Sequence, residues 1–468
     1  MLIRSLSVVT EFIDALSESL KTIKPSAHLS RQQKIGLALI LVGILVTETL
    51  NWALFERRSL KQAKRGRLCW LFYHAKIAWD LLLQASIRNI LADYGIEGGV
   101  LAIDDSAKRR SKHTCKIPDA HKVKDKASGG YFNGQEMVFM ILITEIATLP
   151  VGFRFYTPDP ALSAWRQNDN ALKRRGVAAK QRPSRPQPDH ARYPTKQALA
   201  LELLREFVTA FPTLTIKGVL ADALYGTGAF MDEAATITGG AQIVSQLRAN
   251  QCVASRNSQT DLTRYFARQP GVATDLLIRG GLSKPVTMLA ARLRVKAHGK
   301  RRFVVALKYD NESDYRYLVA SDLSWRHEDI ARLYSLRWLV EVFIQDWKAY
   351  GGWNQQSKQQ GAEGSERGLI LSLLCDHLLL QHPEQSIRLK NNQPGMPTGC
   401  LIERLNVETL VDTIADVVAA DDPAQALEAL TEALDESLPT RDSRKHMAGR
   451  DLGRQDPTAA LAYHAKAA

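Results

Sequence analysis

Apolar residues recur at a helical spacing in the first part of the chain, and the spacing changes near residue 98. The helical pattern covers 5–93, breaks at Pro25 and at 57–59, and closes on Gly95, a residue typical of helix ends. Turn residues separate the three short β-rich runs that follow, 98–106, 137–146 and 149–156. The pattern predicts an all-helical N-terminal region and then a three-stranded meander.

The middle of the chain alternates strand-like and helix-like patterns. A Pro- and Arg-rich segment, 158–195, interrupts them and is expected to be an exposed or partly disordered loop. A helix is then expected at 195–211, a strand that runs into a tight turn at 214–226, and, after a further helix, a strand at 241–249. This alternation predicts an α/β sheet covered by helices. Successive antiparallel strands at 250–324 read as an all-β insertion.

The net charge of the chain indicates what kind of partner it binds. The 468 residues carry +13 and the pI is about 9.4, which favours a polyanion, nucleic acid before a membrane surface. Residues 401–440 hold ten acids and one base, so the excess positive charge belongs to the chain before residue 400. Two basic stretches, 107–126 and 173–196, are either solvated faces or a track for a phosphate backbone, and we favour the track.

Cysteine usage and the N-terminus indicate a cytoplasmic protein. The five cysteines show no paired short spacing, which argues against a zinc site or a disulfide framework and fits a reducing compartment. The first residues have no signal-peptide pattern. The apolar core of 35–55 is too short to span a bilayer, so a buried helix is expected there, with a membrane protein as a weaker alternative.

The stretch 334–348, YSLRWLVEVFIQDWK, reads as one helix with two different sides. A stripe on one side holds four polar-capable residues, Tyr334, Arg337, Glu341 and Lys348. Apolar and aromatic residues occupy much of the remaining surface and are expected to pack, among them Trp338, Phe343 and Trp347. A surface ladder of Arg337 and Glu341 is the alternative to a functional stripe.

Carboxylates also stand at the ends of two predicted strands. The run LAIDDS (101–106) contains Asp104 and Asp105, and the run VLADALYG (219–226) contains Asp222. Each could be a helix cap or a turn residue. Together with Glu341 they are hard oxygen ligands of the kind Mg²⁺ prefers, and paired ions of this type promote phosphodiester chemistry.

Tyr334, Arg337, Glu341 and Lys348 are separated by two, three and six residues, and this spacing resembles the Y-R-E-K signature of the insertion-sequence-four family of bacterial DDE transposases. IDDS and LADALYG resemble the first and second catalytic Asp segments of that family. The similarity spans roughly 98–385. It implies an RNase H-like fold, cut-and-paste DNA transposition dependent on Mg²⁺, with Mn²⁺ as a substitute, and a homodimer on paired transposon ends.

The resemblance assigns roles residue by residue. It makes Asp105, Asp222 and Glu341 the catalytic, metal-binding acids. Asp105 is chosen because Ser106 follows it, and Asp104 is the alternative. Tyr334, Arg337 and Lys348 correspond to residues that contact the DNA phosphates. Candidates for the family's base-stacking aromatic residue are Tyr317 and Trp325.

These observations predict an α/β protein whose RNase H-like core is interrupted by the all-β insertion and flanked by helical ends. The expected first part is a helical region at 1–96, which either binds the transposon ends or is a dimerisation or packing bundle. The first part of the core follows at 97–249, the insertion at 250–324, the second part of the core at 325–385 and an acidic helical region at 386–468.

In the last region, amphipathic helices at 406–420 and 423–438 are expected to form a hairpin that buries its apolar side and supports dimerisation. The expected partner is double-stranded DNA in the nucleoid. The alternatives to an active transposase are an inactive end-binding repressor and a structure-specific nuclease.

Overall fold

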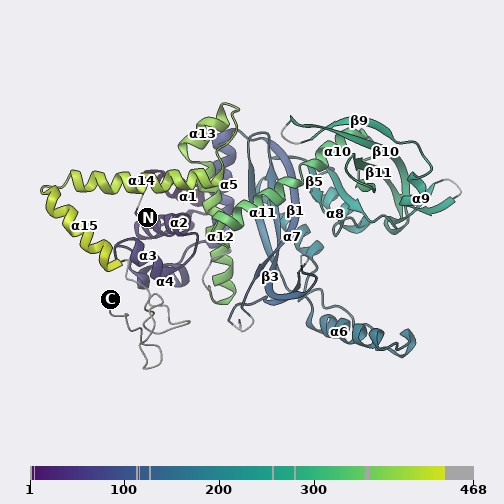
Figure 1. Ribbon diagram of the computed structural model, residues 1–468, viewed down its shortest axis with the longest axis horizontal. Coiled ribbons are helices and arrows are strands. Elements are labelled where there is room, and N and C mark those ends of the chain that lie inside the picture. The colour runs from purple at the N-terminus through teal and green to yellow at the C-terminus, as the bar shows by residue number, and fades with distance from the viewer. Residues whose placement is uncertain are drawn as a thin grey trace, which may run out of the picture.

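The computed structural model describes residues 3–4, 6–111, 114, 116–125, 128–255, 258–278, 281–353 and 359–437. Figure 1 shows an elongated molecule. Helices from both ends of the chain gather at one end, the central sheet lies in the middle, and the later strands form the other end. The expected α/β fold with helical terminal regions is confirmed in this architecture.

The N-terminal region is helical throughout its described length, as predicted. Its helices are α1 Ser7–Ile23, η1 Pro25–Ala27, α2 Arg31–Thr47, α3 Trp52–Arg58, α4 Arg65–His74 and α5 Trp79–Tyr94. Ser30 begins α2 with a capping box to Gln33, and α5 ends on Gly95 with φ of 61°, a left-handed conformation that glycine adopts without strain. Residues 37–45 of α2 are almost all buried, so the first part of the apolar run at 35–55 is a buried helix, and the run continues into α3 after a break at 48–51.

No single helix in the described part of the chain is long and apolar enough to cross a membrane. One bent pair, α2 with α3, meets the length and composition criteria only when the two are taken together, across a 90° bend.

The twelve strands of the described residues form one mixed sheet. They are β1 Gly98–Arg109, β2 His121–Lys124, β3 Tyr131–Ile143, β4 Thr148–Tyr156, β5 Thr215–Ala221, β6 Gln242–Leu247, β7 Cys252–Ser255, β8 Ser258–Asp261, β9 Val272–Leu277, β10 Ser283–Val295, β11 Lys300–Tyr309 and β12 Arg316–Ala320. Strands β1, β3 and β4 form the predicted antiparallel meander. β5 lies parallel to β1 on its other side, and β6 lies parallel to β5.

Helices cover both faces of the central strands (Figure 1). The remaining helices are α6 Pro160–Arg174, η2 Ala179–Gln181, α7 Lys196–Ala210, α8 Gly228–Ile237, α9 Leu262–Phe266, η4 Lys296–His298, α10 His327–Ser335, α11 Trp338–Tyr350, α12 Gly361–Leu380, α13 Pro383–Lys390, α14 Thr398–Val418 and α15 Pro423–Ser437. Two separate cores result. One face of β1 packs with α10, α11 and the N-terminal helices, and the other packs with α7 and α8.

The segment expected to be an all-β insertion also contains the short helices α9 and η4. Its strands do not form an independent sheet, because β12 pairs with β6 and so continues the central one. The order runs from β6 through β12, β11 and β10 to β7 and β8.

The expectation of an irregular loop at 158–195 is wrong for its first half, where α6 forms a helix that projects from the body (Figure 1). Asp159 caps α6, accepting hydrogen bonds from the amides of Ala161 and Leu162. Asp169 on α6 pairs with Lys173 and Arg182, each at 2.7 Å. Two of the basic residues of this segment therefore share a local acidic partner on the helix.

The acidic helices α14 and α15 form where the sequence predicts them, but their apolar side chains remain largely exposed within one chain. Leu410, Ile414, Val418 and Leu427 are all more than half exposed. The hairpin docks on the N-terminal helices partly through ion pairs, such as that between Arg4 and Asp416 at 2.8 Å. The expected burial of the apolar side is thus wrong for the single chain.

Candidate active site

The two adjacent acids of β1 lie on opposite faces of the sheet, because successive side chains of a strand alternate. Asp104 lies on the same face of β1 as Val100 and Ala102, which pack in the core under α10 and α11. Asp105 lies on the opposite face with Leu101 and Ile103, which pack in the core under α7 and α8. Both side chains are partly buried, with 16% and 21% of each exposed.

Asp222 is the first residue after β5, the strand parallel to β1. Its side chain accepts a hydrogen bond from the Leu224 amide at 2.9 Å, and its carbonyl accepts one from Ser245 Oγ at 2.6 Å. One carboxylate oxygen each from Asp104, Asp105 and Asp222 lies within 4.8 Å of the other two. The predicted acids therefore meet at one point, but only Asp222 follows the end of its strand, because β1 continues to Arg109 and holds Asp104 and Asp105 within it.

The Y-R-E-K stretch is two helices and not one. α10 ends at Ser335 and α11 begins at Trp338, with Arg337 at the cap of α11 in helical conformation. Tyr334 therefore lies on the last turn of α10, where its hydroxyl donates to the Ala221 carbonyl at 3.4 Å, and the Arg337 guanidinium lies over its ring at 5.9 Å. Burial raises the pKa of Tyr334.

Arg337 connects Glu341 to the strand-end acids. Its Nη1 donates to Asp104 Oδ2 at 3.0 Å and its Nη2 donates to Glu341 Oε1 at 2.5 Å. Glu341 is 38% exposed and is not one of the three carboxylates that converge within 4.8 Å. The guanidinium thus holds the fourth acid at the edge of the cluster.

Burial raises the pKa of Asp104 from 3.8 to about 6. The amide of Asp105 and the Arg337 guanidinium favour the ionised form, while the neighbouring carboxylates of Asp105 and Asp222 oppose it. Converging carboxylates with this mutual repulsion are a donor set that a divalent cation would stabilise.

On the other face of β1, an ammonium group lies between two carboxylates. Lys196 Nζ donates to Asp105 Oδ2 at 2.9 Å and to Glu136 Oε1 at 3.0 Å. Glu136 Oε2 in turn lies 3.0 Å from His121 Nε2. Burial would lower the pKa of Lys196, but the two carboxylates outweigh it and the pKa is raised. For Glu136, burial alone would raise the pKa, but His121 and Lys196 lower it.

Sequence reasoning missed Lys196, Glu136 and also Tyr225, which follows Asp222 closely. Tyr225 is fully buried, its hydroxyl has no hydrogen-bond partner among the described residues, and burial followed by the nearby acids raises its pKa. The one available signal was positional. Lys196 closes the second basic stretch and directly follows Thr195, whose side chain caps α7.

Other predicted residues lie farther from the acids. Lys348 is on α11 two turns after Glu341, forms no hydrogen bond or ion pair within the described residues, and has a pKa lowered by burial. Trp338 is 46% exposed and so is only partly covered, whereas Phe343 and Trp347 are buried as predicted.

The two base-stacking candidates differ in access. Tyr317 is 5% exposed and its ring stacks on Phe266 at 5.8 Å, which makes it a core residue. Trp325 is partly exposed and lines a cleft with Arg326 and His327 beside β10 and β11. Of the two, only Trp325 has a ring that a ligand can reach in this structure.

The family model of the DDE superfamily endonucleases matches residues 46–304, more than half of the chain. The chain belongs to this family. No curated protein matches it. The match contains Asp104, Asp105 and Asp222 and ends before Glu341, so the Y-R-E-K stretch lies outside it. A DDE endonuclease is a nuclease or transposase-type enzyme, its substrate class is DNA, and its acidic group is suited to a metal ion.

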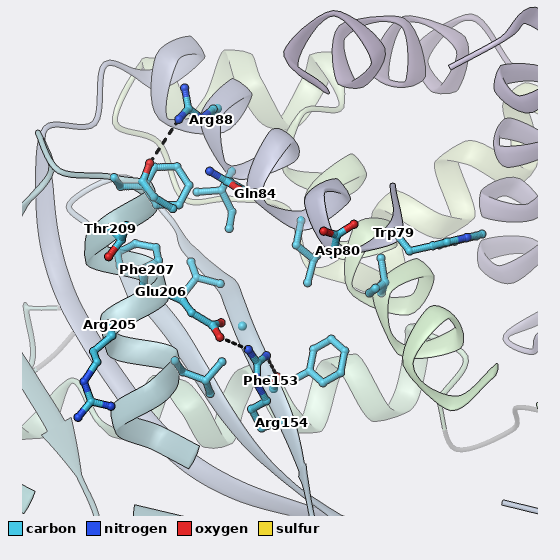
Figure 2. Close-up of a pocket in the computed structure, with 18 of the residues that line it drawn as sticks. Trp79, Asp80, Gln84, Arg88, Phe153, Arg154, Arg205, Glu206, Phe207 and Thr209 are labelled. Atoms are coloured by element: carbon cyan, nitrogen blue, oxygen red, sulfur yellow. Dashed lines mark hydrogen bonds and ion pairs between the residues drawn. The ribbon is translucent and has the colours of Figure 1, made fainter. Parts of the chain in front are cut away.

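The acids of this DDE endonuclease are separate from a cavity of about 1000 Å³ between α5, β4 and α7 (Figure 2). Apolar and aromatic side chains such as Trp79 and Phe207 line it, together with an ion pair of Arg154 and Glu206. Arg88 closes one side by donating to the Ala210 carbonyl at 3.4 Å (Figure 2). None of the clustered carboxylates lines this cavity.

Proposed function

We propose that the protein is the transposase of a bacterial insertion sequence, which binds the terminal inverted repeats and catalyses DNA strand cleavage and strand transfer. The observation that carries this proposal is the convergence of Asp104, Asp105 and Asp222 within 4.8 Å, with Glu341 joined to them through Arg337. Family membership supports the chemistry, and the Y-R-E-K spacing supports the narrower transposase assignment.

Asp105, Asp222 and Glu341 are proposed to hold Mg²⁺, for which Mn²⁺ would substitute. When bound, such ions supply a Lewis acid and an activated water or hydroxyl nucleophile for phosphodiester cleavage. The chain's own cations orient these acids. Arg337 fixes Glu341 and Asp104, and we propose that Arg337, with Tyr334 and Lys348, also contacts the DNA phosphates, for which guanidinium geometry is well suited.

Asp105 is retained as the first acid, and Asp104 receives a different role. Its hydrogen bond to Arg337 and its place on the α11 face make it the residue that positions the guanidinium. The opposite assignment makes a distinct prediction, because then the asparagine variant of Asp104, and not that of Asp105, would lose cleavage outright.

An RNase H-like core is proposed on the same grounds. β1, which carries the acids, lies centrally between antiparallel β3 and parallel β5, and both β1 and β5 deliver carboxylates to the same site. The partner is proposed to be double-stranded DNA held by a homodimer on paired ends. The basic turn at 57–67, between α3 and α4, is the proposed contact of the N-terminal region with the repeats.

The exposed apolar side chains of α14 and α15 are the proposed dimer contact. Leu410, Ile414 and Val418 follow one another along the exposed part of α14, and they are large side chains that association would remove from water. The same helices are acidic, so this surface would face away from the DNA.

The test is a paired binding and cleavage assay on duplexes that carry the inverted repeats flanking the encoding element. Asp222→Asn and Glu341→Gln should abolish Mg²⁺-dependent cleavage and leave repeat binding largely intact, because the carboxylates orient metal and do not grip the duplex. Asp14→Asn, on α1, is the matched control and should cleave normally. Normal cleavage by Glu341→Gln would refute the mechanism.

The description of the family as endonucleases favours one second candidate, a nuclease that needs no paired ends. The same assay separates the two functions. A transposase joins the cleaved ends to a target duplex and requires the repeats, whereas a structure-specific nuclease cuts branched DNA without repeats and produces no joined product. Specific repeat binding without any cleavage by the intact protein would instead indicate the end-binding repressor.

A further inference from the structure

Lys196 forms a second internal ion cluster at the proposed active site, on the face of β1 opposite Arg337. Its ammonium joins Asp105 and Glu136 at 2.9 and 3.0 Å, and the three side chains are 15%, 21% and 17% exposed. Pairs of this kind, largely removed from water and joined by charge-assisted hydrogen bonds, are stronger than surface ion pairs.

The backbone explains why these three residues meet. In the β1–β3 ladder Asp105 lies opposite Val138 and Ala107 lies opposite Glu136, so Asp105 and Glu136 are diagonal neighbours on the same face. The first residue of α7 is Lys196, which places its side chain above this pair.

The start of α7 is also attached to the loop that carries Asp222. Gln197 accepts a hydrogen bond from Thr227 Oγ1 at 3.3 Å and donates one to the Leu224 carbonyl at 2.5 Å. Lys196 therefore reaches Asp105 from a helix end that is held in place by the second catalytic segment.

We propose that Lys196 and a divalent cation bind the Asp105 carboxylate in alternation, so that Lys196 is a positioning residue that sets the metal affinity of the site. This inference rests on the proposed function, in which Asp105 is a metal ligand. Like charges a few ångström apart repel strongly in a partly buried site, so an ion held by Asp105 displaces the ammonium from Oδ2.

Glu136 allows the Lys196 ammonium to leave Asp105 without losing its last carboxylate partner. It bonds Lys196 through Oε1 and His121 through Oε2, so the ammonium keeps one carboxylate partner when it leaves Asp105. The position of Glu136 on β3 places it outside the group of three convergent carboxylates, which suits an anchor for Lys196 better than a metal ligand.

The first measurement is calorimetric titration of the full-length protein with Mn²⁺ in the absence of DNA. Lys196→Met should bind Mn²⁺ about tenfold more tightly than the wild type, since one charge-assisted hydrogen bond no longer competes with the ion. Lys196→Arg keeps the charge and should remain near the wild-type affinity. The matched control is Lys34→Met, which removes a Lys–Asp pair of the same 2.9 Å length on α1 and α2 and should leave Mn²⁺ binding unchanged.

The second measurement needs no variant and so does not depend on the folding of Lys196→Met. Lysines of the wild-type protein are acetylated with and without Mn²⁺ and quantified by mass spectrometry. Lys196 should react severalfold faster with Mn²⁺ present, because its ammonium has left Asp105. Lys108 on β1, which is 4% exposed, should react equally with and without Mn²⁺.

The outcomes separate the two proposals. If Mn²⁺ binds the wild type and Asp222→Asn weakens it, but neither Lys196→Met affinity nor Lys196 acetylation changes, the exchange is refuted and the metal site stands. Weaker Mn²⁺ binding by Lys196→Met would likewise refute the exchange, since it would show that the lysine only supports the ligands. If no Mn²⁺ binds the wild type or Lys196→Met, both proposals fail.

Discussion

Replacing Asp104 with Asn should make the stability of the protein less sensitive to pH. The Asp104 carboxyl is partly buried between Arg337 and two other acids, and its pKa is raised from 3.8 to about 6. A raised acid pKa means that ionisation is harder in the folded chain than in the unfolded one. Asp104 therefore destabilises the fold at neutral pH, and the asparagine variant removes that cost.

The size of the effect follows from the pKa difference. Well below pH 3.8 the carboxyl is protonated in both states and costs nothing, and the cost grows as the pH rises from 3.8 and is complete above the folded pKa of about 6. A pKa difference of about two units corresponds to a cost of roughly 3 kcal/mol in the free energy of unfolding once Asp104 is ionised in both states, at 1.36 kcal/mol per unit. Between about pH 4.5 and about pH 8 the difference between wild type and Asp104→Asn should change by roughly 2 kcal/mol in favour of the variant.

Urea unfolding in EDTA, followed by tryptophan fluorescence at several pH values, gives this difference directly. The attraction between Arg337 and the ionised carboxylate is already contained in the pKa of about 6, so the amide differs from the protonated carboxyl only by an offset that does not vary with pH. The slope is therefore the quantity to compare. Asp421→Asn, at an exposed position between α14 and α15, controls for the loss of a carboxylate. A difference between wild type and Asp104→Asn that is flat across this range, or that falls as the pH rises, would refute the reasoning.

Three further changes test the packing of the N-terminal core, a buried ion pair and the dimer contact. Gly43→Ala places a methyl 2.8 Å from the Phe55 ring in the N-terminal core and should lower the free energy of unfolding by about 1–3 kcal/mol, measured by urea unfolding. Asp232→Asn removes the 2.6 Å partner of Arg302, a guanidinium that is only 2% exposed, and should cost roughly 2–3 kcal/mol in the same assay. Deletion from Asn406 onward should leave a monomer that does not pair two ends, as judged by sedimentation, and unchanged pairing would exclude α14 and α15 as the dimer contact.

Sequence patterns predicted most of the elements that carry the acids. The runs at 98–106 and 214–226 read as strands because their apolar residues are contiguous and turn residues follow them, and the structure places β1 and β5 there. Asp104 and Asp222 converge because the parallel register pairs the residues directly before them, Ile103 and Ala221, although β1 continues to Arg109 beyond the end of β5.

The tertiary partners of these acids could not be predicted in the same way. Lys196 reaches Asp105 across 91 residues, and no local pattern distinguishes it from the other bases of its stretch. The break between α10 and α11 was missed because residues 336 and 337 keep helical angles and contain neither Gly nor Pro. α6 was missed because a Pro- and Arg-rich composition says nothing about Asp169, whose ion pairs hold the helix.

The paired acids of β1 also explain why the site needs cations from two different helices. Adjacent strand residues face opposite sides, so no single helix can neutralise both Asp104 and Asp105. α11 supplies Arg337 to one face and α7 supplies Lys196 to the other, and each cation also holds a second acid, Glu341 or Glu136. In the proposed mechanism an ion on Asp105 would compete with Lys196, and an ion on Asp104 would compete with Arg337. The choice between the two acids would then depend on which cation leaves its carboxylate at lower cost, a property that the small residue after Asp105 does not reveal.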